Sequence, residues 1–143
     1  MRIVYEDEVP KTPEKVFPWI AEPEKAMQWQ KNVMGGEIID SKPEIVGTTF
    51  KEIIEEDGKS LEMQGIITKY VENKIMGFHL ESKIHEFDIS YTIAGIGEAT
   101  KLSIEADIKW KFPLNIISKF MGKRMAGALK KQMESEVQEL KKL

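Results

Sequence analysis

Three side chains that could transfer a proton, those of Glu52, His85 and Tyr91, lie within apolar, strand-like segments of this 143-residue chain. A carboxyl or phenol group among apolar side chains needs a partner, or its pKa rises, because burial disfavours the charged form. Such a group can act as a general acid or base, or it can hold a ligand hydroxyl. A carboxylate in water at the rim of a sheet, or a structural imidazole or hydroxyl, would explain the same residues, so both interpretations stay open.

The sequence does not indicate other kinds of catalytic site. The chain has no Cys and two His, which leaves no thiol nucleophile, disulfide or usual zinc motif. It contains no nucleophile elbow, no phosphate-binding glycine loop and no metal-binding spacing of His and carboxylates. We therefore expect neither a cofactor nor a metal, and we favour a binding protein over an enzyme.

Charge is unevenly distributed along the chain. The net charge is −3, but residues 111–143 carry eight Lys or Arg against three Glu, a net +5. This basic segment could contact an anionic head group or a membrane surface, or it could be a solvated face that complements the acidic remainder. Nucleic acid is not an expected partner, because the overall balance is acidic and no glycine-aromatic motif is present. Without a long apolar run or a secretory signal, we expect a cytoplasmic protein.

Turn residues and apolar spacing predict the elements that would position these groups. Residues 2–9 resemble a strand, and Thr12-Pro13 is typical of a helix start, with Thr as N-cap and Pro in the first turn. Pro23 starts a second short helix, which we expect to continue to Trp29. A series of strands then follows, broken at regular intervals by turn residues.

The strongest hairpin signal is Asp57-Gly58, a two-residue turn that requires positive φ. It places Glu52 opposite Met63 on one face of the sheet. The other face carries charged residues, so the face that holds Glu52 and Met63 is expected to be the buried one.

Residues 73–74 and 82–83 are predicted to form two-residue turns as well. They would place Ile67 opposite Leu80 and Leu80 opposite His85, which carries the same inward face across the sheet.

The last strand and the C-terminal helix show the clearest periodicity. Residues 102–110 alternate between apolar and polar side chains, as in a half-buried strand. From Leu114 to Leu143, apolar residues recur at spacings of three and four, which predicts one long amphipathic helix. This helix would cover the buried face of the sheet.

A single helix covers a curved sheet incompletely, so we expect a cavity lined by aromatic and apolar side chains, with Met adapting its shape to a ligand. An ordinary filled core is the alternative. Gly65 opposite Phe50 would leave further space or mark a bulge. Ile116 and Phe120 would form a portal. The predicted ligand-binding residues are Trp29, Phe50, Glu52, Met63, Met76, Phe78, His85, Phe87, Ile89, Tyr91, Ile104, Trp110, Ile117, Phe120, Met121 and Met125.

This order of elements resembles the START-related helix-grip (SRPBCC) superfamily, and in particular its polyketide cyclase/dehydrase and lipid-transport branch. The resemblance lies in the segments 9–17, 22–29, 46–50 and 62–70 and in the long C-terminal helix. It covers nearly the whole chain and implies one START-like ligand-binding domain over residues 1–143. The implied fold is α+β, a curved antiparallel sheet with two short helices after the first strand and a long C-terminal helix over the concave face.

The resemblance also implies a function class. Members bind lipids, quinones, sterols or polyketides between the sheet and the helix, which implies a hydrophobic or amphipathic small molecule as the partner here. Other members are cyclases, toxins or co-chaperones. Two alternatives therefore stay open: a cyclase/dehydratase-type enzyme using Glu52, Tyr91 or His85, and a module that binds a protein partner through the basic helix.

Overall fold

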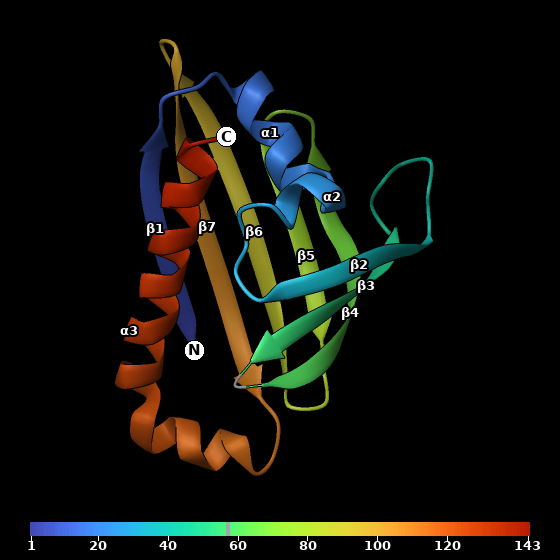
Figure 1. Cartoon of the computed structure of the whole chain (residues 1–143), viewed down its shortest axis with the longest axis vertical. Coiled ribbons are helices and arrows are strands. Elements are labelled where there is room, and N and C mark those ends of the chain that lie inside the picture. The colour runs from blue at the N-terminus through green and yellow to red at the C-terminus, as the bar shows by residue number, and fades with distance from the viewer. Residues whose placement is uncertain (57) are drawn as a thin grey trace.

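The structure of the chain, a computed structural model, describes residues 1–56 and 58–143. Within these residues, seven strands form one antiparallel sheet in the order β1-β7-β6-β5-β4-β3-β2 (Figure 1). The elements are β1 (Arg2–Val9), α1 (Pro13–Ala21), α2 (Pro23–Ala26), β2 (Val33–Asp40), β3 (Thr49–Glu56), β4 (Lys59–Val71), β5 (Ile75–Glu81), β6 (His85–Ile96), β7 (Ala99–Trp110) and α3 (Leu114–Lys141). The predicted helix-grip fold is confirmed.

The two short helices lie together near one end of the sheet (Figure 1). As predicted, α1 follows Thr12, whose extended backbone precedes Pro13 in the first turn. The second helix is shorter than predicted. It ends at Ala26, and Trp29 lies beyond it in a turn. There the indole of Trp29 donates a hydrogen bond to the carbonyl oxygen of Trp19 at 2.7 Å, which fixes the ring on the inner side of the fold.

The first predicted hairpin is confirmed by its register. Glu52 pairs with Met63 and Phe50 with Gly65, as the turn at Asp57-Gly58 predicts. Asp57 itself lies outside the described residues, whereas Gly58 has the positive φ, +75°, that the turn requires.

The predicted register of β4 with β5 is wrong. The connecting turn has three residues, 72–74, with Asn73 in the left-handed region at φ +61°. A register shift at residue 68 moves the pairing by one more residue in the same direction, so Ile67 pairs with Phe78 rather than with Leu80. The two shifts add up to two residues, and a shift of two residues keeps Ile67 and Leu80 facing inward.

The predicted register of β5 with β6 is wrong by two residues. Leu80 pairs with Phe87 and not with His85. Successive side chains alternate between the faces of a strand, so a shift of two residues leaves every inward side chain inward.

The long helix α3 packs through its C-terminal half. Val137 and Leu140 are the buried residues of α3 in the described chain, and both belong to the main core. The first turns of α3 run at a sharp angle to the rest of the helix and lie beyond the end of the sheet (Figure 1). None of the helices in the described part of the chain combines the length and the apolar character needed to cross a lipid bilayer.

Asp7 on β1 joins the sheet to the last turns of α3. The Lys141 ammonium lies 2.8 Å from Asp7 Oδ2, and the Tyr5 hydroxyl donates to the same oxygen at 2.7 Å. Burial disfavours ionisation of Asp7, but the hydrogen bonds from Lys141 and Tyr5 outweigh burial and hold its pKa below the usual value.

Asp7→Asn should lower the free energy of unfolding by about 1–2 kcal/mol near neutral pH. Because the pKa of Asp7 in the folded chain lies below its ordinary value of 3.8, the stabilisation is present above that value and is lost as pH falls through the folded pKa. Urea unfolding of both proteins between about pH 7 and pH 2.5 measures the difference. Glu8→Gln, an exposed neighbour on β1, is the control. An Asp7→Asn effect of equal size across this range would contradict the assignment.

Candidate functional site

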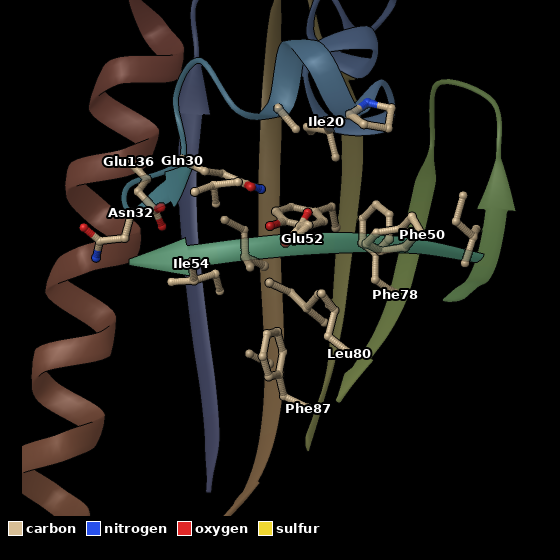
Figure 2. Close-up of a pocket in the computed structure, with 18 of the residues that line it drawn as sticks. Ile20, Gln30, Asn32, Phe50, Glu52, Ile54, Phe78, Leu80, Phe87 and Glu136 are labelled. Carbon is tan, nitrogen blue, oxygen red and sulfur yellow. The ribbon is translucent and has the colours of Figure 1, made fainter. Parts of the chain in front are cut away.

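A cavity of about 400 Å³ lies between the inner face of the sheet, the segment that follows α2 and the C-terminal half of α3 (Figure 2). Its volume is within the range typical of small-molecule pockets. Most of its lining side chains are apolar or aromatic, and they come from the inner faces of β3 to β7. The rest of the wall comes from α1, α2 and the turn after it, from β2 and the loop that follows it, and from Leu129, Gln132, Met133 and Glu136 of α3.

Ten of the sixteen residues predicted to bind a ligand line this cavity. They are Trp29, Phe50, Glu52, Phe78, His85, Phe87, Ile89, Tyr91, Ile104 and Trp110. Their role toward a ligand stays a prediction, since position alone does not show binding.

The other six predicted residues, all in the described part of the chain, lie elsewhere. Met63 and Met76 face inward as expected, but both are fully buried in the core. The remaining four belong to the first half of α3, where they line no part of the cavity; they are Ile117, Phe120, Met121 and Met125. Phe120 is 86% exposed. The face of α3 was predicted from its periodicity, but the first half of the helix does not pack over the sheet.

An edge-to-face series of aromatic rings forms one wall of the cavity. The ring centroids of Phe50 and Phe78 are 5.7 Å apart, and Tyr91 lies 6.2 Å from both Phe78 and Trp29. Gly65 lies beneath the first ring of this series. A Cβ on Gly65 would come closer than 3.0 Å to three ring atoms of Phe50. The expectation that Gly65 leaves space or marks a bulge is therefore wrong, because the Phe50 ring fills that space.

Glu52 introduces a carboxyl group into this apolar wall. It lies on the inner face of β3, between Phe50 and Ile54 (Figure 2). No hydrogen bond or ion pair joins Glu52 to another residue of the described chain. Burial raises the pKa of Glu52 above its usual value.

Two polar residues that the sequence analysis missed, Gln30 and Glu136, face the same part of the cavity (Figure 2). The backbone N–H of Lys31 donates to Glu136 Oε2 at 2.6 Å. Burial nevertheless raises the pKa of Glu136 to about 7. The pKa of the Tyr91 hydroxyl is raised, mainly by burial and then by the charges of Glu136 and Glu52. A hydrogen bond with the Gln30 side chain acts in the opposite direction and lowers this pKa.

The helical spacing contains a signal that could have identified Glu136. It lies three residues after Met133 and four before Leu140, so an acidic residue interrupts the side of α3 that packs on the sheet. No such signal exists for Gln30, because it lies in an irregular turn without periodicity.

His85 and Trp110 lie opposite each other on β6 and β7. Their ring centroids are 5.0 Å apart, and Ser82 Oγ lies 2.7 Å from His85 Nδ1. The indole Nε1 of Trp110 is buried and has no hydrogen-bond partner in the described chain.

Some groups that could ligate a metal gather outside the cavity. Donor atoms of His79, Glu81 and Glu86 lie within 4.8 Å of one another. His79 already contacts Asp88 at 2.9 Å and Glu81 is paired with Lys111 at 2.8 Å. These contacts explain the cluster as surface ion pairs.

Comparisons with known proteins agree with this architecture. Residues 1–143 match the family described as polyketide cyclase / dehydrase and lipid transport. The comparison with curated protein sequences gave no match.

Three solved structures illustrate the shared fold. The crystal structure of TTHA0849 from Thermus thermophilus has a TM-score of 0.81 at 16% identity, over 99% of this chain and 95% of that chain. A START superfamily protein from Mycobacterium smegmatis has a TM-score of 0.70 at 18% identity, over 93% and 97%. MLL2253 from Mesorhizobium loti has a TM-score of 0.70 at 17% identity, over 99% and 95%. The fold agrees with the resemblance to START-related helix-grip proteins, and the match over residues 1–143 shows that the chain belongs to the polyketide cyclase / dehydrase and lipid transport family.

Proposed function

We propose that this chain binds and carries a hydrophobic or amphipathic small molecule in the cytoplasm, of a lipid, quinone or polyketide-like kind. The observation that carries the proposal is the cavity of about 400 Å³ with its largely apolar and aromatic lining. The lipid transport named in the family description supports it.

Binding of the neutral dye Nile red, with native mass spectrometry of the protein purified from its host, tests this proposal. Ala106 lines the cavity from β7 and is buried, so Ala106→Phe should place its ring in the cavity. We expect this change to weaken dye binding at least about tenfold. Lys109→Phe, on the outer face of the same strand, is the matched control and should leave binding unchanged. A wild-type protein that binds no dye and retains no small molecule would overturn the proposal.

An enzyme of the cyclase or dehydratase type is the second candidate, with Glu52, Tyr91 or His85 as the proton-transferring group. It is favoured by the raised pKa of Glu52 inside the cavity, which suits a general acid. The discriminating variant is Glu52→Gln, incubated with a neutral polyketide. Conversion by the wild type alone, with equal binding by both proteins, would favour the enzyme. Binding without conversion would favour the carrier.

We propose further that the first half of α3 makes transient contact with an anionic membrane surface. Its apolar side chains are exposed, with Phe120 86% and Ile116 47% accessible. Residues 114–133 carry five Lys or Arg and no Asp or Glu. Exposed apolar side chains beside uncompensated cations are typical of helices that bind at the surface of an anionic bilayer.

Phe120→Ala should weaken co-sedimentation with vesicles of phosphatidylcholine and phosphatidylglycerol by about tenfold, because the ring would no longer enter the interface. Ile53→Ala, at another exposed apolar residue on β3, is the matched control. Binding to anionic vesicles should also fall as salt rises. Equal binding to vesicles of phosphatidylcholine alone, or no effect of Phe120→Ala, would contradict membrane docking and favour a protein partner.

A further inference from the structure

Two carboxyl groups enter the cavity from different walls. Glu52 belongs to β3 and Glu136 belongs to α3, and Gln30 lies near Glu136 (Figure 2). Both carboxylates act on the Tyr91 hydroxyl, so each of them lies within electrostatic reach of Tyr91.

The basic side chains that border the cavity compensate this pair only in part, through the charge of Lys31 on Glu136. The side chain of Lys42 lies 2.9 Å from Asp40. Lys31 is exposed; its backbone N–H donates to Glu136 and its charge acts to lower the pKa of Glu136, but burial outweighs both effects. In the described chain, Glu52 forms no ion pair. The cavity therefore holds more acidic groups than its own cations compensate.

We propose that the ligand of this cavity carries a protonated amine on an apolar body, held between the carboxylates of Glu52 and Glu136. This inference rests on the proposed binding function and names the charge class of the ligand. The apolar body would lie against the aromatic series, while the Gln30 amide and the Tyr91 hydroxyl lie beside the ammonium.

The physical reason is the cost of a carboxylate in apolar surroundings. Such a group is either protonated or paired with a cation. An ammonium supplies the missing cation to both groups, and each N–H···O⁻ hydrogen bond in a weakly solvated cavity is a charge-assisted one. A ligand carboxylate would add a third acidic group to the same space, where like charges repel. The expected order of affinity is therefore amine, alcohol, carboxylate.

The raised pKa values of the two carboxyl groups give the direction of the pH dependence. The pKa of Glu136 is about 7, so this group gains a proton as pH falls below neutrality. The groups that face it are Glu52 on β3, Tyr91 on β6, Gln30 and Lys31 after α2, and Gln132 on its own helix. Affinity for an amine should rise between about pH 5.5 and pH 8, because the carboxylates must be ionised to pair with it.

Three ligands of equal chain length test the proposal: octylamine, 1-octanol and octanoate, each used to displace Nile red from the full chain. At about pH 8 we expect octylamine to bind roughly tenfold or more tightly than octanoate, with octanol between them. Glu52→Gln and Glu136→Gln should each weaken octylamine binding about tenfold and change octanol binding less than about twofold. The matched controls are Glu55→Gln on the outer face of β3 and Glu134→Gln on the exposed face of α3.

The outcomes separate this inference from the proposed function. If octanol displaces the dye but octylamine binds no better than octanoate, the amine is excluded and a neutral-ligand carrier remains. Equal loss of amine affinity in Glu55→Gln and Glu52→Gln would also overturn the inference, since net charge alone would explain it. If neither the dye nor any octyl compound binds, both proposals fall.

Discussion

Leu140→Ala should lower the free energy of unfolding by about 2–5 kcal/mol. Leu140 is 2% exposed and packs with Val137 in the main core. Truncation of a buried Leu removes transfer free energy and leaves a cavity. The effect should be large here because α3 is held to the sheet through these two buried residues and the Asp7–Lys141 pair. Urea unfolding followed by circular dichroism measures it.

The control lies on the same helix. Met121 is 43% exposed, in the half of α3 that leaves the sheet, so Met121→Ala should change the free energy of unfolding by less than about 0.5 kcal/mol. Losses of similar size for Leu140→Ala and Met121→Ala would mean that the whole helix packs on the sheet in solution. The described arrangement of α3 would then be wrong.

Gly65→Ala should cost about 2–3 kcal/mol and should also weaken binding of a neutral dye. The new Cβ would come closer than 3.0 Å to three atoms of the Phe50 ring, so the ring must move. The open space beside Phe50 is the cavity itself, and a displaced ring would reduce its volume. Thermal unfolding together with Nile red titration would detect both effects.

Gly35→Ala is the matched control for this substitution. A Cβ on Gly35 of β2 meets no atom within 4 Å, so a methyl group fits there without displacing a neighbour. Dye binding should therefore remain unchanged in Gly35→Ala. If Gly65→Ala is as stable as Gly35→Ala and binds dye equally well, the close packing of Phe50 on Gly65 would be disproved.

Local patterns in the sequence predicted most of the fold. The alternation along residues 102–110 matches the inward side chains of β7, and the Asp57-Gly58 signal predicts the register of β3 with β4. Two later registers were wrong, since the dipeptides chosen as turns do not specify loop length. The inward face was nevertheless correct, because the β5–β6 register differs by two residues and the β4–β5 register also differs by two residues beyond residue 68.

Sequence predicted the site less completely than it predicted the fold. Periodicity showed that Met63 points inward, but it did not show whether an inward side chain reaches a cavity or fills a closed core. It also placed Met121 on the apolar side of a helix without showing that this part of α3 leaves the sheet. Glu136 enters the site because α3 packs against β1 and β7, strands far away in the chain, and so borders the cavity that β3 and β6 also line.

The amino-acid sequence by itself determined which side chains share a face, because faces follow from the local periods of strands and helices. It also determined the family, because the order of elements is a property of the chain. Only the tertiary structure decided where the sheet, the turn after α2 and α3 leave a cavity, and that Glu52 and Glu136 enter it together. Those positions depend on the packing of segments distant in sequence, which no local period encodes.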